Sequence, residues 1–371
     1  MHRYPVYKPF IGLKEIYNVV KVIKSGWVSS LGKEIIDFEK KFANSVDCEF
    51  GISVSNATNR LHLVLASLGL SEDDEVIVPD LTFVATANAV KYTKAKLILC
   101  DVNTYDLNIN INCLKKLITS KTRVIMPVHL YGAPCNMDEI LEIASKNDIF
   151  ILEDSAESHF AKYRNKAIGS LGNASVFSFY GNKIITTGEG GMITTNDSKL
   201  NERLKFLRDH AMNKEKRYWH EEVGYNYRLT NIQASFGLAQ LSRKKRIVAE
   251  KIKIFKWYES FLKDIENIYF NHQDTLNQNV YWLVNIFHPD LNSSKIKQIK
   301  LELNKNSIDI RELFYPISMQ PPFSNSYLNK KTSNSHKIYD KGFSLPSYYG
   351  LSKNNVYYIS KILKKILKSI L

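Results

Sequence analysis

A lysine in a polar, glycine-rich turn is the residue of this sequence best suited to covalent chemistry. Residues 175–195 read SVFSFYGNKIITTGEGGMITT, and two strand-like runs flank the turn that carries Lys183. Gly188, Gly190 and Gly191 let the backbone approach a ligand closely or adopt positive φ. A lysine that is held over a pocket and partly desolvated loses its proton more readily, as an amine that forms a Schiff base must. Because most lysines in loops only contact water, a catalytic role for Lys183 is a hypothesis as long as it rests on this residue alone.

An aspartate at the predicted end of a strand is the second candidate. Asp154 follows the strand-like run Ile149–Leu152 in the segment FILEDSAES. A carboxylate at this place can simply cap a following helix. In an enzyme that uses pyridoxal 5'-phosphate (PLP), an ionised Asp here keeps the pyridine nitrogen protonated, so that the ring withdraws electrons. Both interpretations stay open from Asp154 alone.

A polar turn before a helical pattern is the third candidate. Ser53–Asn59 reads SVSNATN and precedes the pattern from Leu61 to Leu70. Such a turn is the usual N-capping signal. It is equally a phosphate site, since the free N–H groups and the dipole of a helix N-terminus favour an anion.

The order of predicted elements indicates where these candidates lie. Short apolar runs alternate with helical patterns along the first two-thirds of the chain. Strands are predicted at Glu75–Pro79, Lys96–Cys100, Val124–Val128 and Ile149–Leu152, and helices at Thr82–Lys91 and Met137–Lys146. This alternation predicts an α/β fold with a mostly parallel sheet between helices. Ligands of such sheets bind beyond the carboxyl ends of the strands, where the candidates lie.

The pattern changes near residue 245. A long helix is predicted at Arg243–Leu262, then a strand-like run at Tyr281–Phe287, a helix around Lys295–Asn304 and a terminal helix. We therefore expect a large domain over residues 1–245, which carries the candidate residues, and a smaller C-terminal α/β domain over residues 246–371.

The combined order of phosphate turn, aromatic residue, strand-end aspartate and lysine resembles the DegT family of sugar-nucleotide aminotransferases, which are fold type I PLP enzymes. The resemblance is nearly end to end and nearest to the 4-aminotransferases exemplified by GDP-perosamine synthase. It is carried by residues 26–35, 55–58, 75–90, 128–140, 153–158, 177–192, 224–241 and 314–323. The segment around Lys183 is highly specific for this family, whereas the phosphate turn alone is weak evidence of the resemblance.

The resemblance implies a role for each cofactor residue. Lys183 forms the Schiff base with PLP and later moves the proton, and Asp154 pairs with the pyridinium. Glu157 lies near the ring hydroxyl, and Phe83 stacks on the ring. The implied phosphate contacts are the backbone N–H groups of Ala57 and Thr58, the Ser178 hydroxyl, and Asn226 of a second subunit.

The resemblance also implies the substrate site and the assembly. Trp27, Ser29, Arg228 and Tyr315 belong to segments that resemble substrate-binding parts. Because Asn226 reaches a neighbouring site, we expect a homodimer with shared active sites.

The implied reaction is a two-step transamination. L-Glutamate converts PLP to pyridoxamine 5'-phosphate, which then aminates a nucleotide-linked 4-keto-6-deoxyhexose to a 4-amino-4,6-dideoxy sugar of the GDP-perosamine type, for a surface polysaccharide such as O-antigen. A dTDP- or UDP-linked sugar, a 3-keto isomer, and a non-catalytic regulatory relative stay open as alternatives. Dehydratases of this family carry His in place of the lysine, so Lys183 argues against that reaction.

The sequence departs from the family pattern at the phosphate turn and at one later position. Ala57 stands where relatives usually have Gly, and Asn59 and Arg60 replace small or apolar residues. We expect Arg60 on a solvated helix face. Ser318 stands where close relatives often carry His, which leaves the sugar contacts open.

Composition argues against several other classes of protein. The formal charge is +14, but the lysines are scattered and not interleaved with aromatics, so we expect no nucleic-acid binding. No signal peptide and no apolar run of about 20 residues is present, so we expect a cytoplasmic protein without a membrane partner. Four cysteines without metal spacing predict no metal site.

The segment Ile359–Leu371 is expected to pack its apolar stripe on the core, although a membrane-surface helix would share the pattern.

Overall fold

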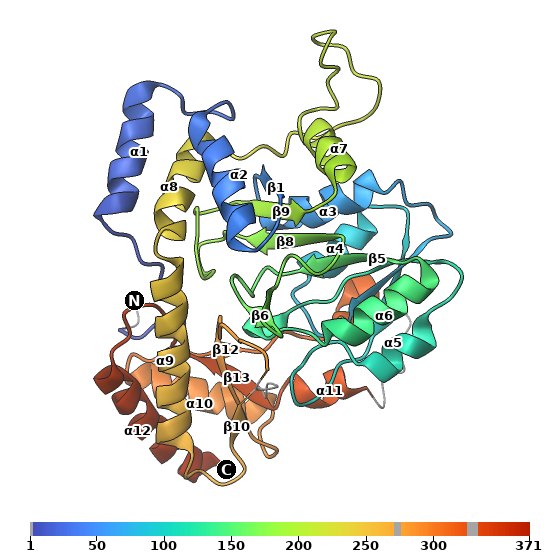
Figure 1. Cartoon of the computed structure of the whole chain (residues 1–371). Helices are drawn as coiled ribbons and strands as arrows, with labels where there is room; N and C mark the ends of the chain where they lie inside the picture. Colours follow the sequence, from blue (N-terminus) through green and yellow to red (C-terminus); the bar gives the residue numbers. More distant parts are fainter. Residues whose placement is uncertain (1–2, 271–275, 325–332) are drawn as a thin grey trace.

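A seven-stranded sheet forms the centre of the protein (Figure 1). The computed structural model describes residues 3–270, 276–324 and 333–371, apart from the Ala57 side chain. In sheet order the strands are β1 (Phe50–Val54), β9 (Gly191–Thr195), β8 (Ala174–Ser178), β5 (Phe150–Asp154), β4 (Thr122–Ile125), β2 (Glu75–Pro79) and β3 (Lys96–Cys100). The last five strands are mutually parallel, and β9 is antiparallel to both neighbours. The predicted α/β fold with a mostly parallel sheet is confirmed.

Helices cover both faces of this sheet, because alternate residues of its strands are apolar on opposite sides. Ile77 faces one core, and Val76 and Val78 face the other. The first core is covered by α2 (Lys33–Ser45), α5 (Ile111–Leu117) and α6 (Met137–Asn147). The second core is covered by α3 (Ala57–Ser67), α4 (Ala85–Lys91) and α7 (Ser198–Arg208).

Several predicted boundaries were wrong by a few residues, among them the start of the strand expected at Tyr281–Phe287, which begins at Val284. The helix expected at Thr82–Lys91 begins only at Ala85. The strand expected at Val124–Val128 ends at Ile125, and Pro127 two residues later has no N–H to continue the ladder.

A second, antiparallel sheet lies below the first in Figure 1. Its strands are β10 (Tyr269–Phe270), β11 (Val284–Phe287), β13 (Gly342–Leu345) and β12 (Arg311–Glu312), and it packs with α10 (Ser293–Lys305) and α12 (Lys353–Ile370). The long helix α9 (Lys244–Leu262) runs along the side of the molecule from α8 (Asn231–Leu241) to this sheet. The division between residues 245 and 246 stays a prediction.

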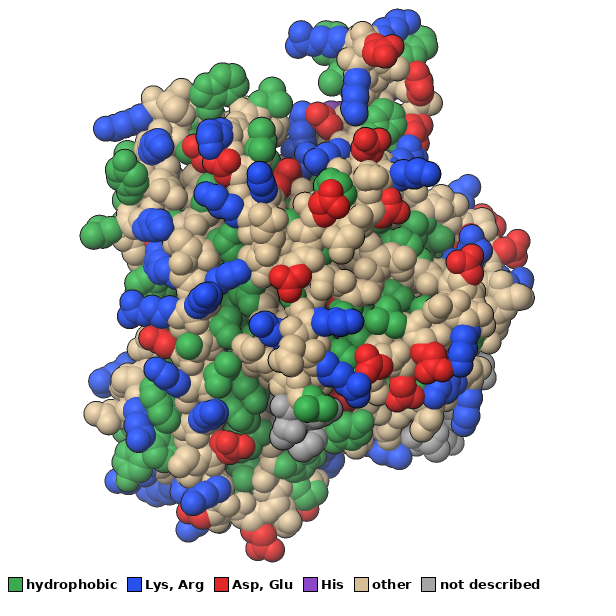
Figure 2. Space-filling model, viewed as in Figure 1, with side chains coloured by type: hydrophobic (Ala, Val, Ile, Leu, Met, Phe, Trp, Pro, Cys, Tyr) green, Lys and Arg blue, Asp and Glu red, His purple; other side chains and the backbone are tan. Residues whose placement is uncertain are grey.

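The apolar stripe of α12 packs on the core, as expected, because Val356, Ile359 and Leu363 are buried. In the part of the chain that the structure describes, no helix has the length and apolar character needed to cross a bilayer. Lys and Arg side chains are spread over the whole face shown in Figure 2. The remaining α-helices and strands of the described residues are α1 (Leu13–Ser25), β6 (Lys162–Tyr163), β7 (Lys166–Ala167) and α11 (Asn334–Ile338).

Candidate active site

One cavity of about 690 Å3 brings together most of the predicted cofactor residues. It lies at the carboxyl ends of β5 and β8, beside the first turn of α3, as expected for ligand sites of parallel sheets. Among the residues that line it are Thr58, Phe83, Asp154, Glu157, Ser178 and Lys183.

Lys183 presents a desolvated amine to this cavity. Its side chain is 11% exposed, and its Nζ lies 3.3 Å from Glu157 Oε1. The same nitrogen lies 3.7 Å from the centroid of the Trp282 ring. Burial lowers the pKa of Lys183, and the nearby Glu157 carboxylate opposes that shift. An amine in this setting gives up its proton more readily than a surface lysine, which favours attack on a carbonyl.

The turn that carries Lys183 depends on glycine. Gly188 and Gly190, between Lys183 and β9, have φ of +84° and +145°, values that residues with a Cβ rarely adopt. At Gly190 a Cβ would also collide with the Thr187 hydroxyl. On the other side of the turn, the Tyr7 hydroxyl donates to the carbonyl of Lys183. The backbone of the turn therefore fixes the position of Lys183, which explains why the glycine cluster in the sequence indicated this turn.

Glu157 is fixed so that one carboxylate oxygen faces Lys183. Its other oxygen, Oε2, accepts a 2.8 Å hydrogen bond from the Tyr131 backbone N–H. Burial raises the pKa of Glu157, and the Lys183 ammonium opposes the rise. A carboxyl group with these neighbours can exchange a proton with the lysine amine.

Asp154 also faces the cavity from the end of β5. Its Oδ2 accepts a 2.9 Å hydrogen bond from the Thr86 hydroxyl, and its Oδ1 accepts from the Ala156 N–H at 3.2 Å. No described helix begins between β5 and β6, so Asp154 does not act as a helix N-cap. That simpler interpretation of the sequence is excluded, and the carboxylate lines the cavity with these two hydrogen bonds in place.

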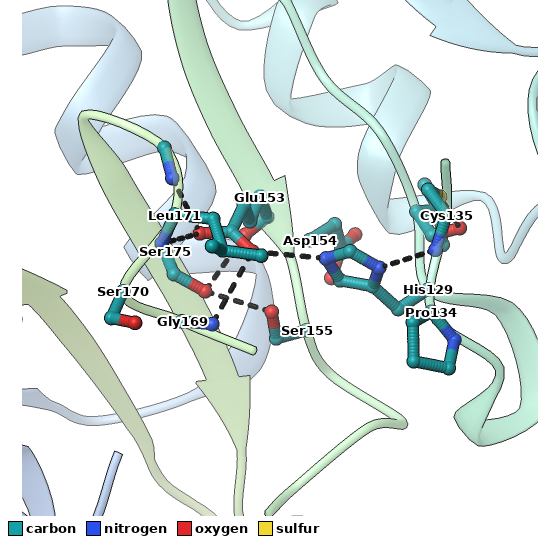
Figure 3. Close-up of polar contacts among 12 residues, drawn as sticks. His129, Pro134, Cys135, Glu153, Asp154, Ser155, Gly169, Ser170, Leu171 and Ser175 are labelled. Atoms are coloured by element: carbon teal, nitrogen blue, oxygen red, sulfur yellow. Dashed lines mark hydrogen bonds and ion pairs between the residues drawn. The ribbon is translucent and has the colours of Figure 1, made fainter. Parts of the chain in front are cut away.

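The neighbouring Glu153 anchors the end of β5 from the opposite face (Figure 3). Its Oε2 lies 3.1 Å from His129 Nε2 and accepts from the Gly169 N–H at 3.3 Å. Its Oε1 accepts from the N–H groups of Leu171 and Gly172 at 3.0 and 2.8 Å. The His129 tautomer follows, because Nδ1 accepts from the Cys135 N–H and Nε2 must then carry the proton donated to Glu153. This buried network fixes the backbone that presents Asp154.

Replacing Glu153 with glutamine is expected to lower the free energy of unfolding by about 3 kcal/mol. Both carboxylate oxygens face donors, so the new NH2 group must face two of them and leave them unpaired. His129 cannot adapt, since its other nitrogen is already an acceptor. Urea titration of the two proteins measures the difference. The exposed variant Glu142→Gln is the control, and equal stability of Glu153→Gln and wild type would contradict this network.

The N-terminus of α3 forms part of the cavity wall. Asn56 is the N-cap, and its side chain accepts from the Asn59 N–H. Ala57 is the first residue of α3, so its backbone is right-handed helical, and the Ala that stands where relatives usually have Gly does not have to adopt positive φ. The remaining free N–H groups of this turn suit an anion.

Arg60 contradicts the sequence-based expectation. It is not on a solvated helix face: it is only 1% exposed and lines the cavity. The reason is tertiary, because α3 packs on the sheet and Gly191 of β9 has no side chain to occupy the space beside the guanidinium.

The predicted substrate residues lie elsewhere in this chain. Among the described residues, Trp27, Ser29, Arg228 and the cofactor residue Asn226 are not part of the cavity lining. Trp27 is 61% exposed, and Arg228 pairs with Asp209 at 2.7 Å and donates to Asn226 at 3.3 Å. Tyr315 follows Phe314, which does line the cavity.

Ser318 is buried in a polar cluster. Its hydroxyl donates to Asp80 Oδ2 at 2.9 Å and lies 2.8 Å from His336 Nε2. An imidazole from another segment therefore lies beside the position where relatives often carry His.

Several residues of the cavity wall had no predicted role, among them Trp282, Arg311 and Phe314. Trp282 and Arg311 belong to the part of the chain that forms the second sheet. No local spacing marks them, and only tertiary packing brings them to Lys183.

Comparison with known proteins shows the family to which the chain belongs. Residues 9–364 match the family model described as the DegT/DnrJ/EryC1/StrS aminotransferase family. The chain is 39% identical to a GDP-perosamine synthase of Escherichia coli O157:H7 (96% of each chain) and 38% identical to one of Caulobacter vibrioides (98% of each).

Solved structures give the same result. The chain superposes with a TM-score of 0.93 and 25% identity on Helicobacter pylori PseC, an aminotransferase in pseudoaminic acid biosynthesis, over 99% of each chain. It superposes equally well, at 25% identity, on Streptococcus pneumoniae Spr1654, solved in PLP and PMP forms, over 99% of this chain and at least 98% of that one. These cofactor-bound relatives imply a PLP cofactor here. The chain belongs to the DegT/DnrJ/EryC1/StrS aminotransferase family, whose members are PLP-dependent sugar aminotransferases.

Proposed function

We propose that the protein transfers the amino group of L-glutamate to the C4 ketone of a nucleotide-linked 4-keto-6-deoxyhexose, with GDP as the preferred carrier and PLP held by Lys183. The observation that carries the proposal is the desolvated Lys183 amine, which faces one cavity together with Asp154 and the N-terminus of α3. The GDP carrier rests on the 38–39% identity to GDP-perosamine synthases over nearly the whole chain. A dTDP- or UDP-linked sugar is the second candidate.

The residues of the cavity fit PLP group by group. Lys183 supplies an amine for the aldehyde, and Asp154 supplies a carboxylate for the pyridine nitrogen. Thr58 and Ser178, at the N-terminus of α3 and the end of β8, supply donors for the phosphate. Phe83 is 54% exposed within this cavity, so its ring is free to cover the ring of the cofactor. When bound, PLP supplies an electron sink for the bond that must break next to the substrate nitrogen.

Lys183 then serves as the acid and base of the reaction. Its lowered pKa lets the amine accept a proton from the substrate carbon and return it at the next position. Glu157, 3.3 Å away, orients the amine toward the cavity and stabilises its charged form. The Trp282 ring, 3.7 Å from the same nitrogen, limits the access of bulk water to the amine.

The second subunit is part of the proposal, because several predicted site residues lie outside the cavity of their own chain. Asn226 and Arg228 belong to the segment between α7 and α8, which extends beyond the body of the molecule (Figure 1). Trp219 and Val223 of the same segment are exposed apolar side chains. A further set of exposed apolar residues lies on α1: Leu13, Ile16, Tyr17, Val20 and Ile23. A homodimer that covers these surfaces can bring Asn226 to the phosphate end of the partner's cavity.

Subunit mixing tests the shared site. Lys183→Ala and Asn226→Ala homodimers are both expected to be inactive. In their heterodimer, one of the two sites has both Lys183 and Asn226 intact. Random exchange makes about half of the dimers heterodimers, so an equal mixture should recover about a quarter of wild-type activity. Activity is measured after denaturing and refolding the mixture, with each variant refolded alone as the control. Inactive heterodimers, once verified with two affinity tags, would contradict a shared site.

The reaction is tested by exchange of the amino group. L-Glutamate should remove the visible absorption band of the PLP-loaded protein and yield 2-oxoglutarate. Addition of GDP-, dTDP- or UDP-linked 4-keto-6-deoxyhexose should then restore the band, fastest with GDP, and yield an aminosugar identified by mass. A PLP-loaded protein that does not respond to L-glutamate or any other amino acid would instead favour a non-catalytic relative.

A further inference from the structure

A buried arginine lies in the wall of the active-site cavity, and two of its nitrogen atoms are unpaired among the described residues. Arg60 is in the first turns of α3 and is 1% exposed. Its Nε and Nη1 atoms are buried and have no hydrogen-bond partner among the residues that the structure describes. Burying a guanidinium without paired acceptors is costly, so this arrangement points to an acceptor supplied from outside the chain.

The surrounding charges leave the arginine cationic. Burial lowers the pKa of Arg60 to about 10, while Asp154 and Glu189 oppose the shift. The side chain thus stays protonated at neutral pH. Asp154 is already engaged by Thr86 and Ala156, and no ion pair within 4.0 Å joins Arg60 to a described carboxylate. An anion that enters the cavity would meet a positive charge in its wall.

The position of the guanidinium identifies the kind of anion. Gly191 lies beside it, and a Cβ there would be 3.0 Å from both Cδ and Nη1 of Arg60. Gly191 pairs with Ser178 across the β8–β9 ladder, and Ser178 and Thr58 line the same cavity. A helix N-terminus, hydroxyl groups and a planar guanidinium are the donors that proteins use for phosphate groups.

We propose that Arg60 is a phosphate-binding residue of the cofactor site. The inference rests on the proposed function, in that it takes PLP as the ligand of this cavity. Arg60 donates to the phosphate of the cofactor in addition to the free N–H groups of α3, and the phosphate completes the hydrogen bonding of the buried guanidinium. The residue therefore binds the part of the cofactor that distinguishes PLP from pyridoxal.

Cofactor affinity tests this assignment without any measurement of turnover. Apoprotein of wild type and of Arg60→Met is titrated with PLP and with pyridoxal, which lacks the phosphate, and the bound fraction is followed by absorbance. Loss of a charge-assisted contact should raise the Kd for PLP by about ten- to a hundredfold. The Kd for pyridoxal should change by less than about threefold, because the lost contact is absent from that ligand. Arg60→Lys, which keeps the charge but not the planar donors, should fall between the two proteins.

The controls separate this inference from the proposed function. Arg123→Met removes a positive charge from an exposed side chain and should change neither Kd. If Arg60→Met does not fold, as judged by circular dichroism, Arg60→Gln carries the same comparison. An unchanged Kd for PLP, or an equal loss for PLP and pyridoxal, would overturn the role of Arg60 while the cofactor assignment stands. Failure of wild-type apoprotein to bind either compound would overturn both.

Discussion

Lys183→Ala is expected to reduce kcat by at least about a thousandfold, because the variant loses both the covalent anchor for PLP and the group that moves the proton. PLP should still bind, since Asp154, Thr58, Ser178 and Phe83 remain in place around the same cavity. The bound cofactor should then show the absorbance of a free aldehyde. Steady-state kinetics with L-glutamate and the ketosugar, together with a spectrum of the dialysed protein, give both readouts.

Two further variants show whether the amine itself is responsible. Lys183→Arg keeps a positive charge beside Glu157 but cannot form the covalent bond, so it should be as inactive as the alanine variant. Lys166→Ala removes an exposed lysine of β7 and should leave kcat unchanged. A kcat of Lys183→Ala within about tenfold of wild type would contradict the proposed chemistry, since a catalytic acid–base group contributes more than that.

Asp154→Asn is expected to have the second-largest effect, a loss of at least about a hundredfold in kcat. The amide keeps the size of the side chain and can still accept from Thr86, but it removes the negative charge that would hold a proton on the pyridine nitrogen. Without that proton the ring withdraws electrons poorly. The measurement is kcat for each half-reaction, followed by the change in absorbance after rapid mixing.

The matched variant Thr86→Val removes only the 2.9 Å hydrogen bond to Asp154 Oδ2. It tests positioning without loss of charge and should reduce kcat far less than Asp154→Asn. Similar losses in the two variants would show that placement of the carboxylate, rather than its charge, is what matters. Full activity of Asp154→Asn would remove Asp154 from the proposed mechanism.

Much of the fold and the centre of the site could be predicted because their signals are local. The alternation of apolar runs with helical patterns gave the parallel strands, and residues at strand ends must share one edge of such a sheet. Glycines near Lys183 adopt the positive φ that the turn requires, so their positions in the sequence predict the turn directly. Asp154, by contrast, stayed ambiguous in the sequence until the structure showed that no described helix starts between β5 and β6.

Features that depend on packing between distant segments could not be read from the sequence. Arg60 is buried because Gly191, about a third of the chain away, leaves it room, and the helical pattern alone favoured a solvated position. Trp282 reaches Lys183 from the second sheet. His336 and Ser318 come together because both contact Asp80. No residue near Ser318 in the sequence therefore takes the place of the His that relatives often carry at this position.

The direct test of the account is to identify which lysine carries the cofactor. The protein has a second buried lysine, Lys251, whose pKa is lowered to about 7 by burial. Its Nζ is enclosed in the core, where it donates to the Trp282 carbonyl at 2.8 Å and to Ser347, and it does not line the described cavity. Low pKa alone would make both lysines candidates, whereas the cavity geometry selects Lys183.

Reduction of the PLP-loaded protein with borohydride, followed by peptide mapping by mass spectrometry, distinguishes them. The account predicts a pyridoxyl phosphate group on Lys183 and on no other lysine at one equivalent per chain. A label on Lys251 or on surface lysines, or no label after saturation with PLP, would contradict the assignment of this cavity as the site of transamination.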